Sequence, residues 1–168
     1  MEDCCCSGEA AGLGGVPERC PECGATGRPV ERVTLKHMVK PQFLEVVNKP
    51  GFRFCGSLGY DVVYFHGDGK RLGKADVRVR VGLKESEDPV PICYCFGFTA
   101  GMVKEEIRTT GRCTIPERIT AEVKAGHCAC EIRNPQGSCC LGNMTTVVKR
   151  LLAGTAKDEP GRRSEVYH

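Results

Sequence analysis

The sequence of 168 residues contains no tryptophan, and aromatic residues make up only 6% of it. Its 40% apolar residues can form a hydrophobic core, but a modest one. No apolar run approaches the roughly 18 residues of a membrane span, and the start Met1-Glu-Asp lacks the basic and apolar regions of an export signal. Basic residues exceed acidic ones by only 24 to 21, without a concentrated basic segment. We therefore expect a cytoplasmic protein without membrane insertion and without nucleic-acid binding.

Cysteine, in contrast, is abundant, with 13 residues. The count is odd, and cysteines are adjacent at 4–6 and 139–140, which does not fit a disulfide scaffold because neighbouring cysteines seldom pair with each other. In a reducing compartment, dense cysteine most often indicates bound metal.

Composition divides the chain into four parts. A flexible tail rich in cysteine and glycine (1–19) precedes a β-rich domain (20–88), a helical domain (89–153) and a polar tail (154–168). The polar stretch 85–91, with two prolines, is typical of a linker. The predicted fold class is α+β, with a small β-rich domain packed on a small helical domain.

Hydrophobic periodicity predicts the elements of both domains. In 31–40, Val33, Leu35, His37 and Val39 occupy alternate positions, as in a half-buried strand. Further strands are predicted at 52–55 and 61–66, as the arms of a hairpin, and at 76–81. Helices are predicted at 99–109, 114–126 and 143–153, with Thr99 as the first N-cap and a capping box from Thr114 to Glu117 for the second.

A metal knuckle is predicted at Cys20-Pro-Glu-Cys23-Gly24. Two thiolates at this spacing can hold one ion, and the glycine allows the positive φ of the turn. Cys55, at the end of the 52–55 strand, is the natural third ligand. A thioredoxin-type redox pair is the alternative, but it requires a helix N-terminus beside a βαβ unit, and the surrounding glycine and proline argue against it.

The fourth ligand of this zinc site stays open. His66 is predicted to lie far along an extended strand, and His37 is expected to pack in the core rather than bind metal. Carboxylate is a less common structural ligand than thiolate, and phenolate is rarer still. The remaining candidates are Asp61, Tyr60, a water molecule, and the tail residues Cys4, Cys5 and Cys6. Those three tail cysteines are alternatively a trap for soft metals, or incidental.

A second group of four cysteines lies in the helical half, at Cys93, Cys95, Cys130 and Cys140. Four thiolates make the two pairs that the two irons of a [2Fe-2S] cluster need, and a loop-borne Cys-x-Cys fits between shielding helices. A second zinc ion is the alternative.

The second half contains three distinctive segments, Pro91-Ile-Cys-Tyr-Cys-Phe-Gly-Phe-Thr99, Ala125-Gly-His-Cys-Ala-Cys130 and Asn134-Pro-Gln-Gly-Ser-Cys-Cys-Leu-Gly142. They resemble the iron-sulfur part of the CopZ-type copper chaperones, which is itself similar to bacterioferritin-associated ferredoxin. The first half resembles the zinc-binding domain of the same family in Cys20-Pro-Glu-Cys-Gly24, Phe54-Cys55, Asp61-Val-Val-Tyr-Phe65 and Val79-Arg-Val-Gly-Leu-Lys84. The resemblance covers roughly residues 18–152.

This resemblance implies a zinc domain packed on a helical [2Fe-2S] domain. The cluster ligands would match Cys93, Cys95, Cys130 and the second cysteine of the adjacent pair, Cys140. Tyr60 stands where the family has its fourth zinc cysteine. Full-length members continue into a copper-binding domain, which we expect to be missing here, together with direct copper delivery by that module.

We thus expect a non-catalytic protein of soft-metal handling, whose cluster passes single electrons to a bound metal or partner. The resemblance implies copper as cargo, with a metal-transport ATPase or an electron donor as protein partner. The alternative is an interaction module with structural metals, docking on a metalloenzyme or regulator. Its basic face would consist of Lys70, Arg71, Lys74, Arg78, Arg80 and Lys84. An enzyme is not expected, because no histidine, carboxylate and nucleophile form a recognisable group.

Overall fold

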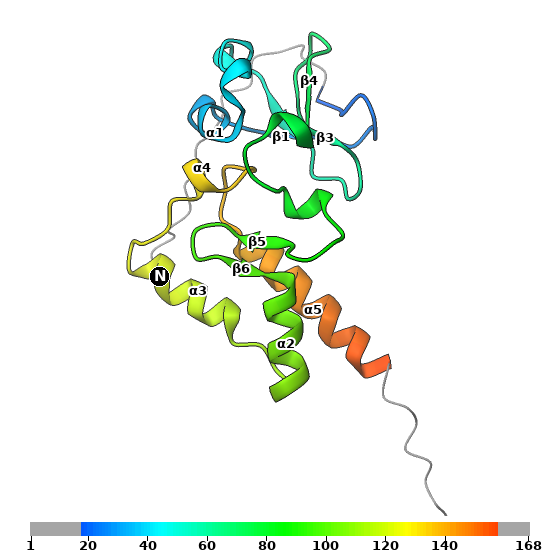
Figure 1. Ribbon diagram of the computed structural model, residues 1–168, viewed down its shortest axis with the longest axis vertical. Coiled ribbons are helices and arrows are strands. Elements are labelled where there is room, and N and C mark those ends of the chain that lie inside the picture. Colours follow the sequence, from blue (N-terminus) through cyan, green and yellow to red (C-terminus); the bar gives the residue numbers. More distant parts are fainter. Residues whose placement is uncertain (1–17, 158–168) are drawn as a thin grey trace, which may run out of the picture.

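Figure 1 shows the computed structural model, which describes residues 18–157. The α+β prediction is confirmed, with a four-stranded antiparallel sheet in the N-terminal half and mainly helices in the C-terminal half. The sheet has the order β1-β2-β3-β4, so each strand pairs with its neighbour along the chain. Its strands are β1 (Arg28–Pro29), β2 (Arg53–Phe54), β3 (Val62–Phe65) and β4 (Arg71–Gly73).

The hairpin predicted at 52–55 and 61–66 is present as β2 and β3, with Phe54 opposite Tyr64. All four residues of β3 are buried. Val63 and Tyr64 belong to the main core of this half, whereas Val62 and Phe65 pack beside cysteines. Burial of both sides explains why this strand has no polar alternation.

The strand predicted at 31–40 is wrong, because this segment forms helix α1 (Arg32–Met38). Thr34, Leu35 and Met38 are its buried residues, which is the spacing of one helix face. Val33 and His37 share the opposite face and are exposed, and His37 Nδ1 contacts the carbonyl oxygen of Val33 at 2.8 Å. His37 is therefore not the packed core residue that we expected.

The strand predicted at 76–81 is also wrong. The sheet ends with β4 on this side, and residues 74–76 and 82–84 form the 3-10 helices η3 (Lys74–Asp76) and η4 (Gly82–Lys84). Val77 makes only an isolated bridge to Val39, although Val77 and Val81 are buried in the core as the alternation suggested. Two further 3-10 helices, η1 (Pro41–Phe43) and η2 (Val46–Asn48), lie between α1 and β2.

The C-terminal half begins with a short antiparallel pair, β5 (Pro91–Cys93) and β6 (Phe98–Thr99). Three longer helices follow, α2 (Ala100–Thr110), α3 (Ile115–Lys124) and α5 (Leu141–Lys157), together with the single turn α4 (Cys130–Arg133). These elements enclose a second core that includes Val103, Ile119 and Met144. The three predicted helices are confirmed, but α4 was not predicted and α5 is longer than expected.

The two predicted caps differ in outcome. The Thr99 side chain accepts a hydrogen bond from the backbone N–H of Met102 at 3.3 Å, so it caps α2. Thr114 precedes α3, but its side chain makes no capping hydrogen bond. Its hydroxyl donates instead to Glu106 on α2, which also accepts from the Thr114 backbone N–H at 3.2 Å. This contact ties α2 to α3 and replaces the capping box.

Segment 130–137 of the C-terminal half packs against the N-terminal half, and Figure 1 shows α4 beside α1. Thr34 on α1 donates a hydrogen bond to the carbonyl oxygen of Glu131 at 2.6 Å. The Tyr64 hydroxyl on β3 donates to the carbonyl oxygen of Pro135 at 2.5 Å. The two halves are therefore joined by specific buried hydrogen bonds as well as by the chain.

None of the helices between residues 18 and 157 combines the length and the apolar character needed to cross a membrane.

Candidate metal centres

The first group of thiols consists of Cys20, Cys23 and Cys55, whose sulfur atoms all lie within 4.8 Å of one another. Gly24, with φ of +72°, closes the turn after the knuckle, and its N–H donates to the carbonyl oxygen of Cys20 at 2.8 Å. Cys55 follows β2 and brings the third sulfur to the pair. Cys20 and Cys55 are almost completely buried, beside Val62 and Phe65 of β3.

This group fits one zinc ion. In a tetrahedral site with Zn–S bonds of about 2.3 Å, neighbouring sulfurs lie about 3.8 Å apart. The Cys23 and Cys55 sulfurs lie 3.6 Å apart. Three thiols on a sheet and a turn, without a helix N-terminus at the pair, also do not form the thioredoxin-type alternative.

The pKa values of two of these thiols change in opposite directions. Burial raises the pKa of Cys20. Burial also acts on Cys23, but hydrogen bonds, first of all from the Ser57 hydroxyl at 3.1 Å, outweigh it and lower the pKa of Cys23 to about 7. A thiol that ionises near neutral pH is suited to bind metal as thiolate.

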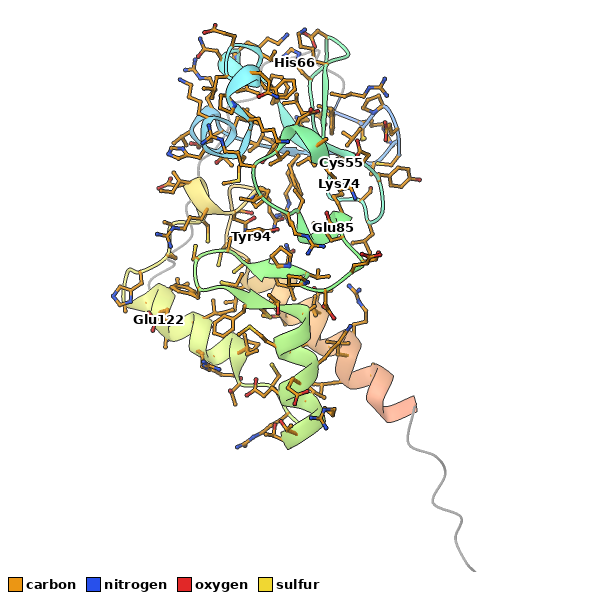
Figure 2. All side chains as sticks on the ribbon, viewed as in Figure 1. Cys55, His66, Lys74, Glu85, Tyr94 and Glu122 are labelled. Carbon is orange, nitrogen blue, oxygen red and sulfur yellow. The ribbon has the colours of Figure 1, made fainter. Side chains whose placement is uncertain are left out.

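Most fourth-ligand candidates lie elsewhere. His66 contacts the carbonyl oxygen of Pro50 and the Asp68 carboxylate, and Figure 2 shows it apart from Cys55. His37 is exposed on α1. Tyr60 is 44% exposed, so it does not occupy the buried position of a structural ligand. The Asp61 carboxylate faces the backbone of Gly73. Cys4, Cys5 and Cys6 lie outside the described residues.

The nearest oxygen group recorded beside the three sulfurs is the Ser57 hydroxyl, which the sequence analysis did not identify. Lys84, at the end of η4, is also beside the site: its ammonium group donates to the Cys55 sulfur at 3.4 Å and to the carbonyl oxygen of Ser57 at 2.6 Å. Burial of Lys84 could have been suspected from its place after the apolar Val81 and Leu83.

The second group is assembled from three segments. Cys93 and Cys95 lie on and after β5, Cys130 begins α4, and Cys140 immediately precedes α5. The sulfurs of Cys95 and Cys130 lie 3.5 Å apart. Cys140 interacts with both Cys93 and Cys130. The structure thus brings all four predicted cysteines together, although they span 48 positions in sequence.

The four sulfurs have different environments. Hydrogen bonds from Cys140 are the main reason that the pKa of Cys93 falls to about 7 and that of Cys130 to about 6. Burial raises the pKa of Cys95 to about 12, although the Ala129 N–H donates to its sulfur at 3.2 Å. Interactions with Cys130 and then Cys93 raise the pKa of Cys140. The network therefore favours thiolates at Cys93 and Cys130.

The quartet is more spread out than the first group. Among the described residues, Cys20, Cys23 and Cys55 are the one set of three such side chains whose ligand atoms all lie within 4.8 Å. No three of the four C-terminal sulfurs therefore all lie within 4.8 Å of one another. Buried Cys93 and Cys140 belong to the helical core, while Cys95 and Cys130 are half-buried.

Tyr94, between the two cysteines of the loop, links the two groups, and Figure 2 labels it together with Cys55. Its hydroxyl donates to the carbonyl oxygen of Arg80 and accepts from the N–H of Gly82, both at 2.9 Å. Gly82 begins η4, which ends at Lys84 beside Cys55. Sequence reasoning missed this role, because an aromatic residue within Cys-x-Cys carries no signal of its partner.

The structure removes one residue, Lys84, from the expected basic face. Lys84 is buried, only 5% exposed. Lys74 and Arg80 both pair with Glu85, and Arg71 pairs with Glu22. The other five residues are exposed, and ion pairs with acidic neighbours offset the charge of three of them.

Comparison with known proteins connects this geometry to a family. A family model described as a zinc binding domain matches residues 17–78, which include all three thiols of the first group. The copper chaperone CopZ of Archaeoglobus fulgidus is 36% identical over 122 residues, which are 73% of this chain and 57% of that protein. The chain therefore spans less than two thirds of the length of this relative.

A solved structure covers the described region more fully. The X-ray structure of the A. fulgidus CopZ N-terminal domain matches with a TM-score of 0.65 and 33% identity. The match covers 77% of this chain and 96% of that domain. Since nearly the whole domain is matched in sequence and in fold, and since the zinc-type thiol group lies in the matched zinc binding domain, this chain belongs to the family of the CopZ N-terminal domain.

Proposed function

We propose that this protein handles soft metal, copper above all, as a non-enzymatic iron-sulfur and zinc protein that transfers single electrons. In this proposal Cys93, Cys95, Cys130 and Cys140 hold a [2Fe-2S] cluster, and the zinc site of the N-terminal half stabilises the fold around it. The observation that carries the proposal is the convergence of these four thiols from three separate segments.

The chain supplies three features that such a cluster needs. Cys93 and Cys130 have lowered pKa values, so they are ready to bind iron as thiolates. The helical core covers Cys93 and Cys140. The N–H of Ala129 donates to the Cys95 sulfur, which is the kind of hydrogen bond that adjusts a cluster's reduction potential.

When bound, a [2Fe-2S] cluster supplies one electron per chain. Cu(II) plus this electron gives Cu(I), and a one-electron donor protein restores the reduced state, so charges and electrons balance. Cys95 and Cys130 are half-buried and Cys139 is exposed, which leaves one side of the site open to such partners. The cargo and the protein partners, including a metal-transport ATPase, are inferred from the family relationship.

Metal and spectroscopic analysis of anaerobically purified protein tests the cluster. We expect brown protein with about two irons and two sulfides per chain and an EPR signal after one-electron reduction. Colourless protein that contains only zinc would contradict the assignment. In that case the four cysteines hold a second zinc ion.

Stoichiometric copper reduction tests the function. Protein reduced by dithionite and freed of excess reductant should convert one Cu(II) per chain to Cu(I), trapped by a Cu(I)-specific chelator. The Cys140→Ser variant, which lacks a proposed ligand, is the matched control and should convert little. A cluster that dithionite cannot reduce would favour the alternative, an interaction module whose metals are only structural.

A further inference from the structure

Lys84 is a buried charged residue beside the zinc site. Its side chain is only 5% exposed. Removing an ammonium group from water is costly unless a counter-charge lies nearby. The environment of Lys84 must therefore supply negative charge.

Carboxylates do not supply this charge. No ion pair recorded between residues 18 and 157 includes Lys84, and the neighbouring carboxylate, Glu85, faces Lys74 at 3.8 Å and Arg80 at 3.2 Å. The two recorded acceptors of Lys84 are the Ser57 carbonyl oxygen at 2.6 Å, which is neutral, and the Cys55 sulfur at 3.4 Å. The three cysteines of the zinc site, as thiolates, are therefore the available source of negative charge.

The charge balance identifies the state in which Lys84 is satisfied. Three thiolates and one Zn²⁺ sum to −1, and a lysine ammonium makes the group neutral. Without zinc, the recorded partners of the buried ammonium are only the Cys55 sulfur and the Ser57 carbonyl oxygen. We propose that Lys84 is the counter-cation of a three-thiolate zinc site, so that its charge strengthens zinc binding. A neutral fourth ligand, such as water or the Ser57 hydroxyl, completes the balance.

The backbone holds Lys84 firmly in this position. Its N–H donates to the Val81 carbonyl oxygen at 2.8 Å, at the start of η4. Gly82 packs so tightly that an added Cβ would lie 1.8 Å from the carbonyl oxygen of Pro91. The Gly82 N–H also donates to the Tyr94 hydroxyl at 2.9 Å, so hydrogen bonds at both ends of η4 keep the ammonium group beside Cys55. This inference does not depend on the cluster or on electron transfer.

Zinc affinity, measured by competition with a chromophoric chelator, tests the proposal. Lys84→Met keeps an unbranched side chain one atom shorter but removes the charge, and we expect it to weaken zinc binding at least tenfold. Lys84→Arg, which keeps the charge, should retain most of the affinity. Lys70→Met, at an exposed position on the β3–β4 turn, is the control and should bind zinc like the unmodified protein.

A second background separates charge from packing. In Cys23→His the zinc site has two thiolates and a neutral imidazole, so its own charge is zero. Lys84→Met should then cost little zinc affinity, because no surplus charge remains to be balanced. Cys20→His provides the same test if Cys23→His does not take up zinc. Unchanged affinity of Lys84→Met in the three-thiolate protein, or an equal loss in both backgrounds, would overturn the proposal.

Discussion

Cys139 and Cys140 are adjacent in sequence but lie in different environments. Cys140 is 2% exposed and interacts with Cys130 and Cys93. Cys139 is exposed, although it also contributes a hydrogen bond to Cys130. Burial among the other three sulfurs favours Cys140 as the ligand, in agreement with the family resemblance.

We therefore expect Cys140→Ser to lose most of its iron and visible absorbance, whereas Cys139→Ser retains most of both. The reason is that serine at 140 removes one of four thiolates, and serine at 139 removes only a neighbour of Cys130. Iron and sulfide analysis of both variants, purified anaerobically in parallel, checks this ranking. Equal loss in the two variants would show that the adjacent thiols substitute for each other.

Gly82 is a position at which a single methyl group should be costly. Its Cβ would meet the Pro91 carbonyl oxygen at 1.8 Å, so Gly82→Ala must displace β5 or η4. We expect a loss of about 3 kcal/mol in the free energy of unfolding, at the upper end of overpacking effects. Gly154→Ala is the control, since nothing lies within 4 Å and helix propensity favours alanine by about 1 kcal/mol. Urea unfolding measures the free energy of unfolding of both variants. If Gly82→Ala is as stable as the unmodified protein, the close approach of Gly82 to Pro91 is contradicted.

At the scale of elements, η4 connects the zinc site with the Cys-x-Cys loop. Tyr94 holds one end of η4 through two hydrogen bonds, and Lys84 at the other end contacts Cys55. Burial raises the pKa of Tyr94 to about 12, so its hydroxyl remains a donor at neutral pH. A substitution at Tyr94 should thus affect both groups of cysteines.

Tyr94→Phe removes both hydrogen bonds and leaves the Gly82 N–H without this partner. We expect a loss of about 1–2 kcal/mol in stability and faster release of iron and of zinc to chelators. The control is Tyr60→Phe, whose side chain is 44% exposed and should change neither rate. Iron release and zinc release are followed separately by absorbance. Normal rates of release in Tyr94→Phe would mean that η4 does not transmit the change.

The elements also show how far sequence reasoning reaches. The hairpin, the three longer helices and both cysteine groups were predicted, because strong apolar runs, a threonine cap and cysteine spacing are local signals. Segment 31–40 was misread because Val33, Leu35 and His37 fit a period of two. Its helix is decided by the burial of Thr34, Leu35 and Met38 in contacts with distant residues such as Glu131. Lys84 and Ser57 were missed as parts of the zinc site because their contacts with Cys55 and Cys23 also join residues that are distant in sequence.

At the scale of the whole molecule, residues 18–157 contain a hydrophobic core in each half and a small third cluster around Cys20 and Cys55 of the zinc site, while the four-cysteine group lies at the core of the C-terminal half. A groove of about 820 Å³ lies between the two halves and is lined from both, including Lys84, Tyr94 and Val147. A small β-rich half with this modest core is expected to gain much of its stability from metal.

Cys23→Ser should therefore loosen residues 20–84 while the helical half keeps the proposed cluster. We expect earlier cleavage in 20–84 during limited proteolysis and a lower thermal midpoint, by about 4–8 °C for each 1 kcal/mol lost. Cys113→Ser, at a half-buried cysteine outside both groups, is the control. If Cys23→Ser and the control behave alike, the zinc site does not support this half.

The packing of segment 130–137 against α1 and β3 has a consequence for how the chain matures. Its hydrogen bonds to Thr34 and Tyr64 join positions 97 and 71 residues apart. During synthesis the N-terminal half emerges first, but these partners arrive only with the segment that also carries Cys130 and leads to Cys140. Contacts of such long sequence separation form late. The four proposed cluster ligands are thus complete only once residue 140 has been made, after Glu131 and Pro135 have become available to the N-terminal half.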